Sequence, residues 1–450
     1  MPNTLAPKLV KMGVKFLGHT PQTIDVVEDR EKFSALLDKL NIDQPLWKRL
    51  KSKKEIIEFA QDIGFPVLMR PSYVLSGRAM FVAYSKEALI DYLETSDSVI
   101  NPEYPVVLSK FIRGAKEVDF DAVARRGQIL VWAISEHVEH AGVHSGDATL
   151  VLPSFSLSDE AVEQIKEASI KISKTLFLNG PFNIQFLVNE DGRAFPEVLV
   201  IEGNMRASRS FPFASKVLGI NFIDLATKVM LGIKVKPFRI KRPPFTGVKV
   251  PHFSFTRLRK VDPVLRVEMA STGEVACFGE NIYEAYLKSL LSTGISLSNK
   301  AALISLGGKE YKQMLLQTCR RLIKLGFIIY ATENTAKFLK VNRLLATQVY
   351  KVFEKKSPNV LDIINQRKVD LVINLSDRED IGVKQFSQIE TDGYMIRRAT
   401  VDANIPLYTK STIANLFVNS IYKYDLGNLK IKSWNEYLDT IESKGTEEIL

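Results

Sequence analysis

Oxygen-bearing and basic side chains lie together at the ends of two predicted strands. The pattern places Gln185 on one strand and Glu202 with Asn204 on its neighbour. Hard cations such as Mg²⁺ prefer oxygen ligands and leave coordination positions for substrate phosphates. Arg206 and Arg209 follow directly, where guanidinium groups can neutralise phosphate oxygens. We interpret this segment as a magnesium and phosphate site, against the alternative of a solvated loop with ordinary surface charges.

A basic hairpin is the second candidate for a functional site. The segment R-P-S-Y-V-L-S-G-R-A-M begins at Arg70 and predicts a strand, a turn and a second strand. Ser76 and Gly77 give a small turn before Arg78. The backbone N–H groups of such a hairpin can face the oxygens of a polyphosphate, although a plain hairpin with exposed arginines is the alternative. The chain has neither a Walker A pattern nor a dinucleotide-binding fingerprint, so the nucleotide site must be of another kind.

Three of the five histidines, His137, His140 and His144, lie in the segment E-H-V-E-H-A-G-V-H-S-G-D. Their spacing matches no zincin signature, and Gly142 and Gly146 indicate an irregular loop. We favour a loop in which His144 donates a hydrogen bond to an anionic intermediate, with Gly146 allowing close backbone approach. Structural zinc and a Ser-His-Asp triad are the alternatives, and no G-x-S-x-G elbow supports the triad.

A further group of polar residues lies in the last third of the chain. In the segment A-T-E-N-T-A, Thr332 and Thr335 open a predicted helix that follows a strand. They could hold an anion at the helix N-terminus, but simple helix capping is the favoured interpretation from this segment alone. Four more polar residues could converge with them at strand ends: Lys312, Lys351, Asn374 and Ser376.

The elements that must position these residues belong to two kinds of fold. In the first half of the chain, strands and helices are interleaved and some strands are antiparallel, which indicates an α+β domain. From residue 301 onward, short apolar strands alternate with helices, which is typical of a doubly wound parallel sheet. Strands are expected at 14–18, 106–111, 117–123, 129–135, 183–188, 197–202, 301–306, 327–331 and 370–375, and helices at 25–40, 53–63, 159–176 and 314–325.

Composition narrows the classes of function. A length of 450 residues predicts more than one domain. The net charge of +10 suits anionic substrates, and the absence of long Lys or Arg blocks argues against nucleic-acid binding. Cys277 and Cys319 are too far apart in sequence to suggest a disulfide framework. Neither a membrane-spanning run nor a signal peptide is evident, so we expect a cytoplasmic protein without nucleic-acid or membrane partners.

Nearly the whole chain resembles the second synthetase unit and the regulatory domain of carbamoyl-phosphate synthetases. The matching runs include E-D-R-E-K-F, the basic hairpin, the histidine segment, R-A-S-R-S-F-P-F and M-A-S-T-G-E-V, in the order of the family. The segments P-H-F-S-F-T-R-L and V-I-N-L-S resemble the eukaryotic pyrimidine-pathway members. The resemblance implies an α+β ATP-grasp domain, followed by an α/β, doubly wound domain of the methylglyoxal-synthase-like type.

The resemblance also implies domain boundaries. The chain lacks the glutaminase and the first synthetase unit of the family, so we expect Met1 to begin a piece of a longer protein. The expected segments are a remnant of the preceding domain at 1–20, the ATP-grasp domain at 21–240, a connector with the end of the synthetase unit at 241–300, the regulatory domain at 301–430 and a polar tail at 431–450.

The activity that the resemblance implies is that of a ligase, a glutamine-hydrolysing type of carbamoyl-phosphate synthase. This unit would phosphorylate carbamate with ATP, using Mg²⁺ or Mn²⁺, with K⁺ as a further candidate ion. The first synthetase unit and a glutaminase would be its partners. The alternatives are another ATP-grasp carboxylate–amine ligase, such as a biotin carboxylase-like enzyme, and an inactive regulatory or assembly fragment.

Residue roles follow from the matching motifs. Arg30 and Arg70 match the phosphate-side arginines of the family, Glu117 its nucleotide-ribose carboxylate and His144 its loop histidine. Lys351, in Y-K-V-F-E, matches a phosphate-binding lysine of nucleotide-regulated members, so a nucleotide or ribose-phosphate effector is expected rather than N-acetylglutamate. The implied sets are catalytic Arg206, Arg209 and His144; metal-binding Gln185, Glu202 and Asn204; and ATP-binding Arg30, Arg70, Ser76, Gly77, Arg78, Glu117, Gly142, His144, Gln185 and Glu202.

Overall fold

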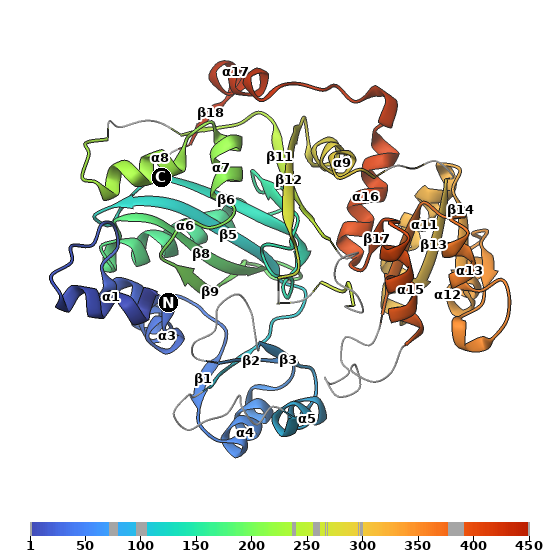
Figure 1. The fold of residues 1–450 in the computed structure, drawn as a ribbon, viewed down its shortest axis with the longest axis horizontal. Coiled ribbons are helices and arrows are strands. Elements are labelled where there is room, and N and C mark those ends of the chain that lie inside the picture. Colours follow the sequence, from blue (N-terminus) through green and yellow to red (C-terminus); the bar gives the residue numbers. More distant parts are fainter. Residues whose placement is uncertain are drawn as a thin grey trace.

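The structure, a computed structural model, consists of a small lobe, a central body and a C-terminal domain (Figure 1). In this view the small lobe lies below the central body and the C-terminal domain lies beside it. No helix among the described residues is long and apolar enough to cross a membrane. The structure describes residues 2–71, 80–95, 106–235, 240–254, 262–265, 267, 269–295, 297, 300–376 and 391–448.

The central body is built on a seven-stranded sheet with the order β12-β11-β7-β6-β5-β8-β9, in which all neighbouring strands are antiparallel. Helix α8 packs against β5 and β8, and Phe120, Phe182 and Phe222 are fully buried in the core. The strands are β5 (Lys116–Arg125), β6 (Gln128–His140), β7 (Leu150–Leu152), β8 (Gly180–Asn189), β9 (Glu197–Asn204), β11 (Thr246–His252) and β12 (Gly273–Gly279), and the helices are α1 (Pro2–Lys11), α2 (Pro21–Glu28), α3 (Arg30–Lys39), α6 (Asp159–Thr175), α7 (Phe211–Leu218), α8 (Phe222–Met230) and α9 (Ile282–Ser292).

The small lobe is a four-stranded antiparallel sheet with the order β1-β4-β2-β3, covered by two helices. The expected hairpin is present, because β2 pairs with β3 and Met69 lies opposite Phe81. Its turn, with Ser76, Gly77 and Arg78, lies outside the described residues. The elements are β1 (Trp47–Leu50), α4 (Lys53–Ile63), β2 (Val67–Pro71), β3 (Phe81–Ala83), α5 (Lys86–Thr95) and β4 (Val106–Lys110).

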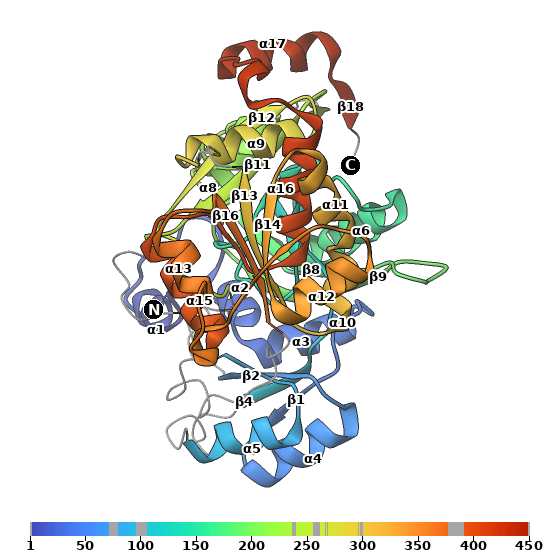
Figure 2. The same cartoon turned by 90° about the vertical axis from the view of Figure 1, so that its right-hand side faces the viewer.

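The C-terminal domain confirms the expected parallel sheet. Its five strands follow the order β15-β14-β13-β16-β17, all neighbours are parallel, and helices cover both faces (Figure 2). The elements are β13 (Ala301–Leu306), α10 (Lys309–Met314), α11 (Leu316–Lys324), β14 (Ile328–Thr332), α12 (Glu333–Val341), β15 (Thr347–Val349), α13 (Val360–Asn365), β16 (Leu371–Leu375), α15 (Asp392–Asp402), β17 (Leu407–Tyr408) and α16 (Ser411–Lys423).

The central body and the C-terminal domain share a hydrophobic core. Helix α16 packs against α9 and β6, and one buried cluster contains Val138 and Tyr286 of the central body together with Tyr408 and Phe417 of the C-terminal domain. Burying aromatic side chains on both sides contributes strongly to such a contact. The two bodies are therefore joined by packing as well as by the chain.

The segment expected as a polar tail returns to the central body. Helix α17 (Trp434–Lys444) buries Tyr437 and Ile441 in the core of that body. The hydroxyl of Tyr437 donates to the carbonyl of Phe278 at 2.9 Å. Strand β18 (Thr446–Glu448) then pairs with β10 (Ile240–Arg242). The helix is polar on its exposed face only, and Figure 1 shows it lying over the central body.

Two local predictions are wrong. Residues 14–18 form no strand; Gly13 and Gly18 take positive φ angles of 75° and 86°, which turn the chain there. The single helix predicted at 25–40 is two helices, α2 and α3. The carboxylate of Asp29 accepts the backbone N–H groups of Glu31 and Lys32, at 3.0 and 3.1 Å, and so starts the second helix.

Candidate active site

Three acids alternate along β5: Glu117, Asp119 and Asp121. Alternate residues of a strand point to the same face, so these carboxyl groups share one side of the sheet. All three are at least nine-tenths buried. Because a buried charge is costly without partners, the groups around these acids define the site.

Asp119 lies at the centre of a hydrogen-bonded group. Its Oδ2 lies 2.8 Å from Nε2 of His137, and its Oδ1 accepts from the side-chain amides of Asn183 and Gln185 at 3.1 and 3.0 Å. Burial acts to raise the pKa of Asp119, but the hydrogen bond and charge of His137 outweigh it and the pKa is lowered. Burial acts to lower the pKa of His137, yet Asp119 and Glu117 raise it above its ordinary value.

Asp121 fixes the segment that carries the two arginines. Its carboxylate accepts the hydroxyls of Ser208, at 2.6 Å, and Ser210, and the amide of Asn183 at 2.9 Å. Ser208 and Ser210 flank Arg209 in sequence, so Asp121 holds in place the turn after β9, residues 205–210. We call this segment the arginine turn. Burial raises the pKa of Asp121 to about 7, and the nearby charge of Asp119 adds to this effect.

The expected metal ligands lie opposite one another on β8 and β9. Gln185 faces Glu202 directly, and Asn204 donates to Oε1 of Glu202 at 3.3 Å. Because Nε2 of Gln185 donates to Asp119, its Oε1 is the atom that can face a cation. Between the two β9 ligands, Gly203 has no side chain, and a Cβ there would lie 2.6 Å from Val27 of α2. Carboxylate and amide oxygens in this arrangement fit a hard divalent cation.

Basic groups surround this oxygen set. Arg30 lies 3.7 Å from Glu202, and Arg206 donates to Oδ1 of Asn204 at 3.3 Å. Across from them on the small lobe, Arg70 donates to Ser109 at 3.4 Å, while its buried Nε has no hydrogen-bond partner among the described residues. Burial lowers the pKa of Arg70 to about 9, and the charge of Arg30 acts in the same direction. Two neighbouring guanidinium groups of this kind favour an anion between them.

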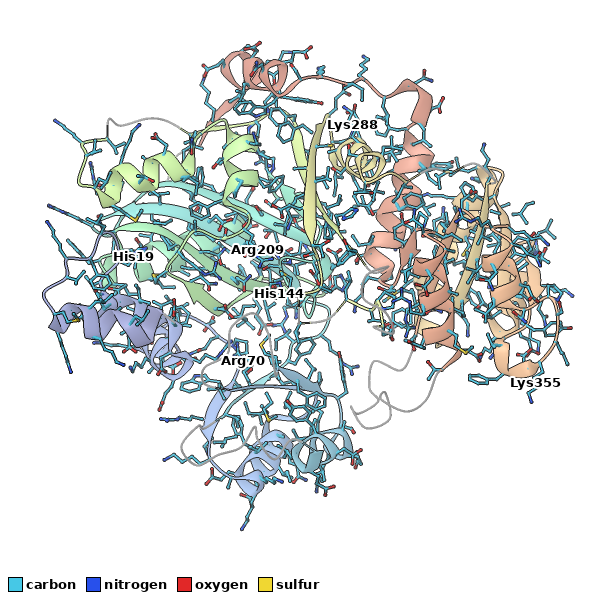
Figure 3. The ribbon with its side chains drawn as sticks, in the orientation of Figure 1. His19, Arg70, His144, Arg209, Lys288 and Lys355 are labelled. Atoms are coloured by element: carbon cyan, nitrogen blue, oxygen red, sulfur yellow. The ribbon has the colours of Figure 1, made fainter. Side chains whose placement is uncertain are left out.

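The segment between β6 and β7, residues 141–149, carries His144, and we call it the histidine loop. Figure 3 shows His144 and Arg209 at the lower edge of the central body, above Arg70 on the small lobe. Nδ1 of His144 accepts the backbone N–H of Gly146 at 3.0 Å, so Nε2 carries the proton in the neutral ring. Burial lowers the pKa of His144 below its ordinary value, with Asp147 opposing and Arg209 assisting. His144 is thus a neutral hydrogen-bond donor near pH 7, as the anion-contacting interpretation requires.

The same loop also reaches the acids of β5. The backbone N–H of Gly142 donates to Glu117. Burial raises the pKa of Glu117 to about 7, and the charges of Asp119 and Glu202 act in the same direction while His137 opposes them. His140 is exposed, and its charged neighbours are Asp191, Lys410 and Lys116. No group of three or more His, Cys, Asp or Glu side chains placed to hold a metal ion occurs within the described part of the chain.

The candidate effector residues lie at one edge of the parallel sheet. Thr332 is the N-cap residue of α12, but its side chain makes no capping bond; its hydroxyl contacts Ser305 at 3.3 Å. Thr335 accepts the N–H of Leu306 at 3.0 Å instead of capping. Simple capping, the interpretation favoured from the sequence, is therefore wrong for both threonines. Lys351, Asn374 and Ser376 lie at or just after the carboxyl ends of β15 and β16, whereas Lys312 lies in the last turn of α10, the helix that follows β13.

Sequence reasoning missed several residues of the site. Asp119, Asp121, Asn183 and the two serines of the arginine turn were not identified. The signal was present in K-E-V-D-F-D-A-V, where acids recur at every second position of an otherwise apolar strand. Acids on the buried face of a strand are rare unless they are paired.

Comparisons with known proteins identify the two domains. The family model described as "Carbamoyl-phosphate synthase L chain, ATP binding domain" matches residues 29–237, and the "MGS-like domain" matches residues 314–409. The biotin carboxylase domain of 2-oxoglutarate carboxylase from Hydrogenobacter thermophilus is similar in fold, with a TM-score of 0.53 at 15% identity, covering 65% of this chain and 70% of that one. Biotin carboxylase from Campylobacter jejuni has a TM-score of 0.52 at 16% identity, covering 64% and 70%. The chain is thus an ATP-grasp protein with an MGS-like domain.

Comparison with relatives of similar sequence identifies the family more narrowly. Multifunctional protein URA2 of Saccharomyces cerevisiae is 45% identical over 93% of this chain, and mitochondrial carbamoyl-phosphate synthase (ammonia) of Homo sapiens is 45% identical over 94%. The chain spans only 19% and 28% of the length of these two relatives. It belongs to the carbamoyl-phosphate synthase large-chain family and corresponds to the C-terminal half of that large chain, with the second ATP-grasp unit and the MGS-like domain.

Proposed function

We propose that the ATP-grasp domain phosphorylates carbamate with ATP, giving carbamoyl phosphate and ADP. The observation that carries the proposal is the oxygen set of Gln185 on β8, Glu202 directly opposite it on β9 and Asn204 two residues further along β9, with Arg206 and Arg209 on the turn that follows. Phosphoryl transfer needs positioning and charge neutralisation more than covalent chemistry by the protein. This arrangement supplies both.

Each part of the site has a proposed role. Gln185, Glu202 and Asn204 hold Mg²⁺ or Mn²⁺, which when bound neutralises charge on the ATP phosphates. Arg30, from the central body, and Arg70, from the small lobe, bind phosphate oxygens. K⁺ is a further candidate ion, without a site assigned to it.

The reacting group is placed by the histidine loop and the arginine turn. Nε2–H of His144 donates to the transferred phosphoryl group or to its acceptor, and Arg209 offsets the charge that develops there. Carbamate hydrolyses readily, so the site must also exclude water. Ser76, Gly77 and Arg78, which the sequence assigns to ATP binding, lie outside the described residues.

The proposal extends to the longer protein. A first synthetase unit that phosphorylates bicarbonate and a glutaminase that supplies ammonia are the proposed partners, in pyrimidine or arginine biosynthesis in the cytoplasm. The relatives include a multifunctional protein and an ammonia-dependent mitochondrial synthase, so glutamine dependence is part of the proposal. The MGS-like domain binds a nucleotide or ribose phosphate through Lys351 and its neighbours at the sheet edge.

The direct test is the reverse partial reaction of the purified chain. ATP formation from ADP and carbamoyl phosphate, dependent on Mg²⁺, is the expected result and can be followed with a luciferase-coupled assay. ADP release that requires bicarbonate and biotin instead would replace the proposal with a biotin carboxylase-like activity. Nucleotide binding without any turnover would favour a regulatory or assembly fragment.

A further inference from the structure

The loop between β11 and β12 contacts both the active site and the MGS-like domain. We call residues 253–272 the β11–β12 loop; its described residues are 253–254, 262–265, 267 and 269–272. Its base is closed by the N–H of Thr272, which donates to the carbonyl of His252 at 2.9 Å, and by the hydroxyls of Ser254 and Thr272, 2.9 Å apart. The loop therefore leaves and returns to the sheet at a fixed point.

One end of the β11–β12 loop is hydrogen-bonded to the histidine loop. Asp147 is fully buried, and its carboxylate accepts the backbone N–H groups of Ala270 and Ser271 at 2.8 and 2.9 Å. The hydroxyl of Ser271 donates to the carbonyl of Gly146 at 3.0 Å. Three hydrogen bonds thus join the β11–β12 loop to the segment that directly follows His144.

The same end also contacts the arginine turn. The sulfur of Met269 lies against Nη1 of Arg209. It also lies where a side chain on Gly146 would be, because a Cβ there would come within 2.8 Å of that sulfur. Met269 therefore lies against Arg209 and beside Gly146, two residues after His144, so a shift of this loop is expected to disturb both segments.

The other end is fixed to the MGS-like domain. Arg397 of α15 donates to both carboxylate oxygens of Asp262, from Nε at 2.7 Å and from Nη2 at 2.5 Å. Arg397 is buried, and its remaining Nη1 donates to Oδ1 of Asn374 at 2.8 Å. Gly393 makes room for this guanidinium, since a Cβ there would lie 2.9 Å from Nη1. Arg397 thus joins the loop to Asn374, a candidate effector residue near the end of β16.

We propose that the β11–β12 loop transmits the state of the MGS-like domain to His144 and Arg209, with Asp262, Arg397 and Asp147 as positioning residues. A bidentate pair is short and directional, so Asp262 must follow Arg397 or the pair must break. An anion bound beside Asn374 competes for or reorients the Arg397 guanidinium. The effect of this connection on turnover rests on the proposed carbamate phosphorylation; the connection itself does not.

Hydrogen exchange on the full chain tests the connection without substrates. In Asp262→Asn, the backbone amides of Ala270 and Ser271 should exchange roughly tenfold faster than in the wild type, in line with typical couplings between sites. The matched control is Asp402→Asn, which removes the partner of the adjacent Arg398 on the exposed side of α15 and should leave these amides unchanged. Equal exchange in Asp262→Asn and wild type overturns the proposal.

A second variant guards against misfolding. Arg397→Lys keeps the positive charge but loses the two-pronged geometry, so it should reproduce the faster exchange of the same amides while the chain stays folded. Protection of these amides at the wild-type level in a folded Arg397→Lys chain would also overturn the proposal.

Turnover supplies an independent readout. Uridine triphosphate should change the rate or the KM for ADP in the wild type. In Asp262→Asn, the ratio of each value with the nucleotide to the value without it should be about one. The dissociation constant of the nucleotide, measured by calorimetry, should stay within about threefold of the wild-type value. A full response in Asp262→Asn overturns the proposal. A wild-type chain that makes no ATP from carbamoyl phosphate refutes the proposed function instead, and the exchange experiment still decides the connection.

Discussion

Replacing Asp121 with Asn should change how the stability of the central body depends on pH. The carboxyl group is fully buried and accepts hydrogen bonds from Ser208, Ser210 and Asn183. The folded protein raises its pKa from 3.8 to about 7, mainly through burial and then through Asp119. Asn has the same shape but carries no charge, so it resembles the protonated acid at every pH.

The magnitude follows from the linkage between proton binding and folding. A rise of roughly three pKa units corresponds to about 4 kcal/mol of unfavourable free energy once the group is ionised in both states. The sign is set by the folded state, which holds the proton to higher pH than the unfolded chain does. Wild-type stability therefore falls from about pH 4 to about pH 7 through this group, and between pH 5 and pH 8 the loss is about 3 kcal/mol.

Urea unfolding at pH 5 and pH 8 measures this difference. Trp132 is buried in the core of the central body and reports its unfolding by fluorescence. Asp121→Asn should lose about 3 kcal/mol less than the wild type across this interval. The exposed Asp224→Asn, which removes an ion pair with Lys228 on α8, should keep the wild-type dependence. The same loss of stability with pH in Asp121→Asn and wild type would refute the assignment of a raised pKa to this group.

Three further predictions concern the proposed sites. Glu202→Gln should lower ATP formation from carbamoyl phosphate and ADP by about 10²-fold or more, because a charged oxygen ligand is lost; Glu197→Gln on the same strand, paired with Arg193, should not, and near-normal activity of Glu202→Gln would contradict the metal assignment. His144→Asn should impair turnover while leaving ADP binding largely intact, and a stoichiometric zinc ion lost in this variant would restore the structural-metal alternative. Lys351→Ala should weaken calorimetric binding of uridine triphosphate, and added salt should weaken it further; binding of N-acetylglutamate alone would contradict the nucleotide proposal.

The oxygen ligands could be found from the sequence because they follow strand periodicity and are close in the chain. Gln185 and Glu202 lie on β8 and β9, which are consecutive in the chain and neighbours in the sheet, so a single hairpin pairs them. The parallel sheet of the C-terminal domain was predicted for the same reason, since each apolar strand is separated from the next by a helix. In local patterns of this kind, the spacing of residues along the chain is enough to predict how they are arranged.

Other features depend on contacts between distant segments. Asp119 and Asp121 belong to a strand whose apolar residues dominate its pattern, and their partners lie at least 18 residues away along the chain. The apolar face of α17 is hard to recognise in a polar composition, because it consists of Tyr437, Ile441 and the partly buried Leu438. The break between α2 and α3 depends on one capping carboxylate, that of Asp29, within a continuous helical pattern. No window of neighbouring residues contains this information.

The return of the chain through α17 to the central body has a mechanical consequence for the MGS-like domain. Both of its covalent connections begin on the same body: one follows α9, and the other is pinned where Nε1 of Trp434 donates to the carbonyl of Lys216 at 3.0 Å. A domain that is attached at two points and packed against the central body has fewer relative motions available than a domain on a single linker. A single proteolytic cut in either connection would leave it attached through the other.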